Sequence, residues 1–229
     1  MQFPIRPDMI LIDLDGTLID SVPDLAFCVD GMMRELNQPP HGEAAVRNWV
    51  GNGVDRLIKR ALTGTLDGEP SDAEFERACP IFLRLYGDNT ATRSHPYPGV
   101  REGLDWLRDC GYRLGCVTNK AARFTEPLLA DTRLRDLFQV VVSGDTLPEK
   151  KPSPMPLLHA ASMLGADASR ALMIGDSVSD VKAARAAGFG IICMSYGYNH
   201  GQDIRDAEPD AVIDSMTELG GLLAAEASG

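Results

Sequence analysis

The chain has 229 residues, 44% of them hydrophobic, and its 33 acidic and 22 basic residues give a net charge of −11. This length and hydrophobicity allow a buried core in one or two domains, which excludes a largely disordered protein. The acidic balance excludes nucleic acid as a partner, although a metal ion and a few local cations can still form a site for a small anion.

Features of secreted, zinc-ribbon and membrane proteins are lacking. The five cysteines form no C-x-x-C pair, so neither a zinc ribbon nor a disulfide framework is indicated. Residues 1–8 lack the apolar core of a signal peptide, and no apolar run reaches the ~18 residues of a membrane span. We therefore expect a cytoplasmic protein with no membrane partner, either a monomer or a homodimer.

The first predicted element is a buried strand over residues 9–14. Asp13 and Asp15 stand at its end, and the chain turns at Gly16. In such a carboxylate pair, one group can attack phosphorus while the other exchanges a proton with the leaving oxygen and then with water. Their mutual repulsion requires a cation, and Mg²⁺ is favoured because it prefers hard oxygen ligands. The alternative is a strand-ending turn in which Asp and Gly serve only the backbone geometry.

The stretch from about residue 23 to residue 95 shows helical periodicity and no convincing strand. A capping-box sequence opens its last helix at Ser71. Four helices are expected: one that begins near Ser21, and three over residues 43–50, 54–62 and 71–86.

This helical stretch predicts a small α-helical cap domain over residues 21–95, inserted into a core domain made of residues 1–20 and 96–229. Two linkers that lie close together would hinge the cap over the core as a lid. A glycine-containing turn at Gly51 and Asn52 precedes one of its helices, so its N–H groups are candidates to contact a substrate carboxylate. A plain helix–helix turn is the alternative.

The rest of the chain alternates short apolar runs with helical patterns, which is typical of a Rossmann-like α/β core with a parallel sheet. The carboxyl ends of such strands meet at one sheet edge. Strands are expected over residues 112–117, 139–142, 171–174 and 190–194, and helices over residues 100–109 and 178–187.

Two polar sequences follow in this part of the chain. Thr118 and Asn119 end a strand, where a hydroxyl and an amide can hold a phosphoryl group; an ordinary helix N-cap is the alternative. Lys151 precedes a proline that restricts the backbone and can direct the ammonium group into the site. A solvated basic loop that includes Lys150 is the alternative there.

The last polar sequence places Asp176 and Asp180 at the start of the helix over residues 178–187. Asp176 leaves a strand end toward the expected metal, and Asp180 is placed to support Asp176 or Lys151. Helix capping by acidic residues is the alternative, but it explains one carboxylate more easily than two.

The run from Asp13 to Ser21 resembles the first motif of the haloacid dehalogenase superfamily, in its helical-cap phosphatase branch. The resemblance implies that Asp13 is the nucleophile, that Asp15 is the acid and base, and that Lys151 rather than Lys150 is the catalytic cation. It also implies ligands for substrate and metal: Thr118 and Asn119 for the substrate, and Asp13, Asp176 and Asp15, the last through its carboxylate or its backbone carbonyl, for Mg²⁺.

Other sequences, such as those at residues 20–25, 49–53, 144–148 and 195–199, are similar to the phosphoglycolate phosphatase family within this superfamily. This resemblance implies hydrolysis of 2-phosphoglycolate to glycolate and phosphate through an aspartyl-phosphate. Two alternatives stay open: a phosphatase or phosphomutase that acts on another small phosphorylated metabolite such as a sugar phosphate, and a non-catalytic phosphate-binding or sensor module. A dehalogenase is disfavoured because a departing halide needs no proton from Asp15.

Overall fold

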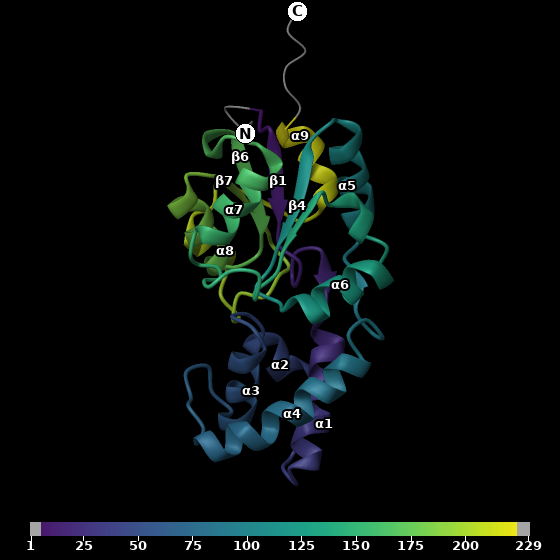
Figure 1. Cartoon of the computed structure of the whole chain (residues 1–229), viewed down its shortest axis with the longest axis vertical. Coiled ribbons are helices and arrows are strands. Elements are labelled where there is room, and N and C mark those ends of the chain that lie inside the picture. Colours follow the sequence, from purple (N-terminus) through teal and green to yellow (C-terminus); the bar gives the residue numbers. More distant parts are fainter. Residues whose placement is uncertain (1–5, 224–229) are drawn as a thin grey trace, which may run out of the picture.

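The computed structural model describes residues 6–223 (Figure 1). Residues 1–5, part of the segment in which no signal peptide is expected, and residues 224–229, at the end of the predicted core domain, lie outside the described part. Within residues 6–223, none of the helices combines the length and the apolar character needed to cross a membrane.

A six-stranded parallel sheet forms the centre of the core, in the order β5-β4-β1-β6-β7-β8. Its central strand β1 is fully buried, because helices cover both faces of a parallel sheet. The fold class predicted from the sequence, an α/β core with a Rossmann-like parallel sheet, is confirmed. The strands are β1 (Met9–Ile12), β4 (Arg113–Val117), β5 (Val140–Val142), β6 (Ala171–Gly175), β7 (Gly190–Met194) and β8 (Ala211–Ile213).

Two layers of helices cover this sheet (Figure 1). On one face, α5 (Val100–Asp109), α6 (Ala122–Asp131) and α9 (Leu219–Leu223) contribute to one hydrophobic cluster. On the other face, α7 (Met155–Leu164) and α8 (Val178–Ala187) contribute to a second cluster. Short 3₁₀ helices occupy Arg135–Leu137, Ala168–Arg170, Ile204–Ala207 and Met216–Glu218.

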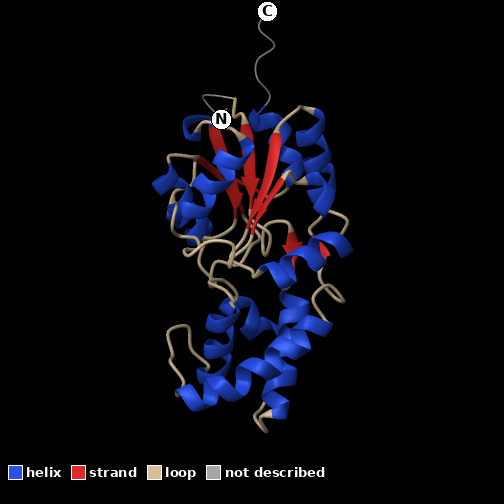
Figure 2. Cartoon of the chain, viewed as in Figure 1, coloured by secondary structure: helices blue, strands red, loops and turns tan. Residues whose placement is uncertain are grey.

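A separate group of helices, here called the helical unit, follows the first strand and lies at the carboxyl ends of the sheet strands (Figure 2). These helices pack around a hydrophobic cluster of their own that includes Met32, Ile58 and Phe82. The predicted capping box at Ser71 is confirmed, since its hydroxyl accepts from the backbone N–H of Glu74 at 3.3 Å. The helical unit consists of α1 (Val22–Glu35), α2 (Glu43–Trp49), α3 (Val54–Thr63) and α4 (Asp72–Asp88).

The two linkers of the helical unit lie side by side. Strand β2 (Ile19–Asp20) pairs antiparallel with β3 (His95–Pro96). Next to this pair, the buried carboxylate of Asp24 accepts hydrogen bonds from the backbone N–H groups of Arg93 and Ser94 at 2.9 and 2.8 Å. Both connections to the core are therefore joined at one place.

Candidate active site

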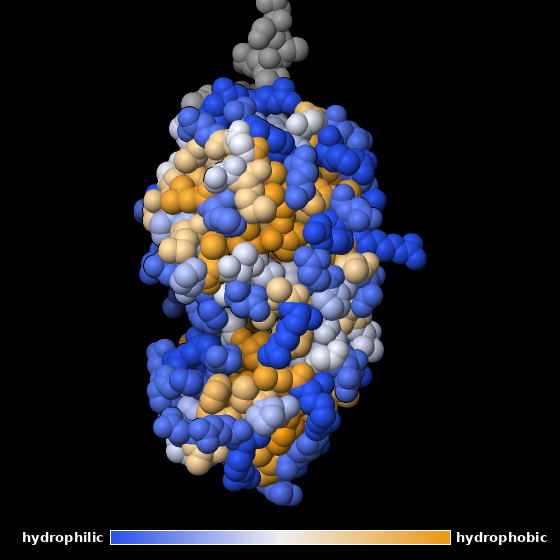
Figure 3. Space-filling model, viewed as in Figure 1, coloured by the Kyte–Doolittle hydropathy of each residue, from blue (hydrophilic) through white to orange (hydrophobic). Residues whose placement is uncertain are grey.

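A cavity of about 280 Å³ lies between the core and the helical unit, where the molecule narrows (Figure 3). Its core side is formed where β1, β4 and β6 end, as expected for parallel strands. Its other side includes the α2–α3 loop (residues 50–53). The cavity collects all the candidate residues predicted from the sequence: Asp13, Asp15, Gly51, Asn52, Thr118, Asn119, Lys151, Asp176 and Asp180.

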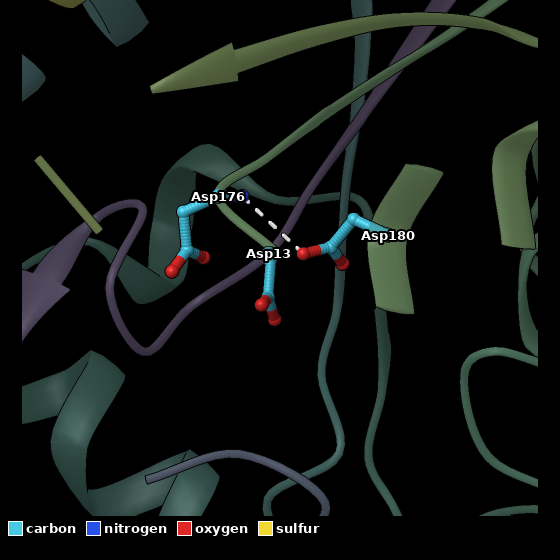
Figure 4. Close-up of side chains that lie close together, drawn as sticks. All are labelled: Asp13, Asp176 and Asp180. Carbon is cyan, nitrogen blue, oxygen red and sulfur yellow. Dashed lines mark hydrogen bonds between the residues drawn. The ribbon is translucent and has the colours of Figure 1, made fainter. Parts of the chain in front are cut away.

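Three carboxylates form a buried cluster in this cavity (Figure 4). Asp13 follows β1, Asp176 follows β6, and Asp180 lies in the first turn of α8, with one oxygen of each within 4.8 Å of the others. Asp180 Oδ2 also accepts from the backbone N–H of Asp176 at 3.3 Å. Asp180 therefore lies where the sequence places it, in contact with both Asp176 and Lys151.

The cluster has the properties of a site for a hard divalent cation. Burial raises the pKa of Asp13 to about 7, against the opposing effect of Lys151. Burial, followed by the charges of Asp180 and Asp13, raises the pKa of Asp176 well above its ordinary value. Among the described residues, the buried Oδ1 of Asp13 accepts no hydrogen bond of ordinary geometry, although the Lys151 ammonium lies 2.8 Å away. Buried carboxylates that lie this close and repel one another fit a metal ion such as Mg²⁺.

Lys151 supplies the positive charge nearest to Asp13. Its Nζ lies 2.8 Å from Asp13 Oδ1, as an ion pair without hydrogen-bond geometry, and 2.7 Å from Asp180 Oδ1. Burial alone would lower the pKa of Lys151, but these two carboxylates raise it above its ordinary value. Asn119 Nδ2 donates to the backbone carbonyl of Lys151 at 2.9 Å, so this amide holds the lysine loop in place.

Asp15 lines the same cavity, but its carboxylate is paired with a different lysine. Lys120 Nζ lies 2.9 and 3.1 Å from the two carboxylate oxygens of Asp15. The side chain of Asp15, predicted as a metal ligand through its carboxylate or its backbone carbonyl, does not belong to the carboxylate cluster of the described residues. Sequence reasoning gave Lys120 no role, although it directly follows Thr118 and Asn119.

Asp176 is oriented by two further residues that sequence reasoning missed. Thr17 Oγ1 donates to its Oδ1 at 2.8 Å, and the backbone N–H of Tyr198 donates to its Oδ2 at 2.6 Å. Gly16 has φ +86°, and a Cβ there would lie 2.3 Å from Asp176 Oδ2. The first motif therefore needs glycine at this position so that β1 and β6 can bring their carboxylates together.

The model of the haloacid dehalogenase-like hydrolases matches residues 10–194 of this chain. The chain belongs to this family. The match extends from β1 to β7 and includes Asp13, Asp176 and Lys151.

Relatives within the haloacid dehalogenase-like hydrolases are similar over nearly their whole length. The chain is 65% identical to a phosphoglycolate phosphatase of Nitrosococcus oceani, over 95% of this chain and 97% of that protein. It is 47% identical to a phosphoglycolate phosphatase of Nitrosospira multiformis, over 95% and 96%. A solved structure of a predicted phosphoglycolate phosphatase from Haemophilus somnus superimposes with a TM-score of 0.88 at 34% identity, and 95% of this chain and 98% of that chain are covered.

Proposed function

We propose that this chain is a Mg²⁺-dependent phosphatase that hydrolyses 2-phosphoglycolate to glycolate and phosphate. The observation that carries the proposal is the buried group of Asp13, Asp176 and Lys151, with Asp15 in the same cavity. The 65% identity to a phosphoglycolate phosphatase over 95% of the chain supports the choice of substrate.

The carboxylates of Asp13 and Asp176, together with the backbone carbonyl of Asp15, would hold the Mg²⁺ ion. When bound, the ion supplies positive charge that offsets the carboxylate repulsion and polarises the phosphoryl oxygens. Asp180 orients Asp176 and pairs with Lys151, and so supports the site without being required as a ligand.

The two chemical steps use the protein's own carboxylates. An oxygen of Asp13 attacks phosphorus in line, the P–O bond of the ester breaks, and the leaving alkoxide takes a proton from Asp15, which must leave its ion pair with Lys120 to carry one. Asp15, now ionised, then takes a proton from water as the water oxygen attacks phosphorus. The bond between phosphorus and Asp13 breaks, which releases phosphate and restores the carboxylate. Lys151 and the hydroxyl of Thr118 stabilise charge on the phosphoryl oxygens.

The helical unit would act as a cap that covers the cavity, with residues 21–95 as an inserted domain between core segments 1–20 and 96–229. Its α2–α3 loop lies on the cavity wall opposite Asp13. Closure would exclude water other than the reacting molecule. The cytoplasmic location expected from the sequence remains part of the proposal.

A substrate panel tests the proposed function. Purified protein is assayed with 2-phosphoglycolate, hexose phosphates, nucleoside monophosphates and pyrophosphate, each with Mg²⁺ or with a chelator. We expect phosphate release that depends on Mg²⁺ and the highest kcat/KM with 2-phosphoglycolate. A kcat/KM for 2-phosphoglycolate no higher than for the others contradicts the substrate assignment. Transfer of phosphate to a sugar hydroxyl without release would instead identify a phosphomutase.

A further inference from the structure

A buried arginine holds the α2–α3 loop from behind. Arg60, on α3, is only 5% exposed. Its guanidinium donates to the backbone carbonyls of Trp49 at 2.6 Å, Gly51 at 3.4 Å and Leu66 at 3.0 Å. It also donates to the side-chain Oδ1 of Asn52 at 3.2 Å. All four acceptors are neutral oxygens, and three of them belong to the loop or to the residue before it.

Within residues 6–223, no carboxylate lies at ion-pair distance from the guanidinium of Arg60, although Asp67 is near enough to act on its charge. Arg56, one turn earlier on α3, differs in this respect, since it pairs with Glu69 at 2.5 Å and Asp67 at 3.4 Å. Burial and the charge of Arg56 lower the pKa of Arg60 against the opposing effect of Asp67, but an arginine stays protonated at neutral pH. A buried cation without an anion is unfavourable, so an anionic ligand at this wall would be stabilised.

The hydrogen bonds of Arg60 also determine which atoms of the α2–α3 loop are left free at the cavity. Oδ1 of Asn52 is turned toward Arg60, and Nδ2 of the same amide has no hydrogen-bond partner among the described residues. Asn52 lines the cavity that contains Asp13. The loop reaches toward the core (Figure 1), and a Cβ at Gly53 would lie 3.3 Å from the ammonium of Lys150 and 3.7 Å from the backbone carbonyl of Asn119. The acceptor of Asn52 is thus occupied, and its donor is left for a ligand.

We propose that Arg60 is a positioning residue that sets the specificity of this cavity. By fixing the amide of Asn52 and by its own charge, it favours short phosphate esters that carry a carboxylate at the end opposite the phosphate. Asp13 and Lys151 receive the phosphate, and Asn52 Nδ2 receives the carboxylate. This inference rests on the proposed function and assigns its substrate selectivity to named residues of the helical unit.

Steady-state kinetics with two substrates tests the inference. Ethyl phosphate has the length of 2-phosphoglycolate but a methyl group in place of the carboxylate. Asn52→Asp and Arg60→Met should each raise KM for 2-phosphoglycolate by about tenfold or more, the scale of one charge-assisted hydrogen bond. KM for ethyl phosphate and kcat for both substrates should change less than about twofold. Arg56→Met, the matched control on the same helix, should leave all four constants unchanged.

Asn52 is exposed, so Asn52→Asp keeps the test decisive if Arg60→Met folds poorly. Equal increases in KM for both substrates, or no increase in Asn52→Asp, would overturn the inference. A wild-type protein that hydrolyses neither ester refutes the proposed function instead. Calorimetry with wild type and Asn52→Asp then decides the inference: it stands if wild type binds 2-phosphoglycolate more tightly than ethyl phosphate and the variant does not, and it falls otherwise.

Discussion

Lys151 is the residue on which the buried charges of the site depend most. Its ammonium group contacts Asp13 and Asp180 at 2.8 and 2.7 Å and donates to the carbonyl of Val117 at 2.8 Å. Buried charges are tolerated only when they are paired and hydrogen-bonded. Lys151 therefore serves the folded state as well as the proposed chemistry.

Replacing this lysine should reduce both stability and activity. In Lys151→Met, two buried carboxylates lose their shared cation, so the free energy of unfolding should fall by about 3–5 kcal/mol and turnover should be lost. Urea unfolding at pH 8 and phosphate release measure the two effects. The exposed neighbour provides the control, since Lys150→Met should change stability by less than about 0.5 kcal/mol. A Lys151→Met protein as stable and active as this control would contradict the role given to Lys151.

At this scale, the sequence predicts the residues at strand ends better than the contacts between them. Asp13 and Asp176 were predictable because each follows a short apolar run, and parallel strands end at one edge. The partners of Asp15 and Asp176, namely Lys120 and Tyr198, were not. Their contacts depend on how loops that are distant in the sequence pack together, and the spacing of apolar residues along the sequence does not predict this packing.

At the scale of elements, the predicted bounds of helices and strands agree best with the structure where the local sequence and the tertiary packing favour the same element. Helices α5 and α8 have the bounds predicted from the sequence, and α8 ends at Gly188 in the left-handed region. The predicted strand over residues 9–14 is shorter in the structure, where β1 ends at Ile12 and the backbone N–H of Asp13 makes a last hydrogen bond to Ile174. Strand β8 was missed, since three residues give too short a pattern to recognise without their neighbour β7.

The hydrogen bonds of Asp24 to the backbone of Arg93 and Ser94, here called the linker clamp, give a prediction about the connection between core and helical unit. Asp24→Ala removes the acceptor for the backbone N–H groups of Arg93 and Ser94, and should lower the free energy of unfolding by about 2–4 kcal/mol. Urea unfolding measures the loss. Arg93→Ala is the comparison variant: it removes a guanidinium that pairs with Asp24 at 3.3 Å but keeps the backbone donor, so its loss should be smaller than that of Asp24→Ala. Equal, small losses in both variants would show that the clamp does not hold the linkers.

At the scale of the whole molecule, the chain carries a net charge of −11. Its stability therefore depends on how the carboxylates that are buried in the active site are neutralised. The pKa of Asp13 in the folded protein is about 7, against an ordinary value of 3.8. Between pH 3.8 and about 7, Asp13 is therefore protonated in the folded protein and ionised in the unfolded chain. Without metal, this contribution to stability is complete below pH 3.8 and is lost as the pH rises through 7.

Mg²⁺ should replace that proton, so the rise in melting temperature on adding Mg²⁺ should be larger at pH 8 than at pH 5. At 100 times its dissociation constant, a ligand of the folded state adds about 2.7 kcal/mol. Thermal unfolding with and without Mg²⁺ at both pH values provides the measurement. Asp176→Asn should lose most of the response. A response equal at both pH values, or retained in Asp176→Asn, would contradict the metal site.

The central claim is that the phosphoryl group is carried transiently by Asp13, and chemical trapping tests it most directly. Protein turning over 2-phosphoglycolate with Mg²⁺ is quenched with borohydride, which reduces an aspartyl-phosphate to homoserine, and its peptides are analysed by mass spectrometry. The account predicts homoserine at position 13 of the wild type only during turnover. Homoserine at another aspartate, or none in wild type while Asp13→Asn still releases phosphate, would contradict it.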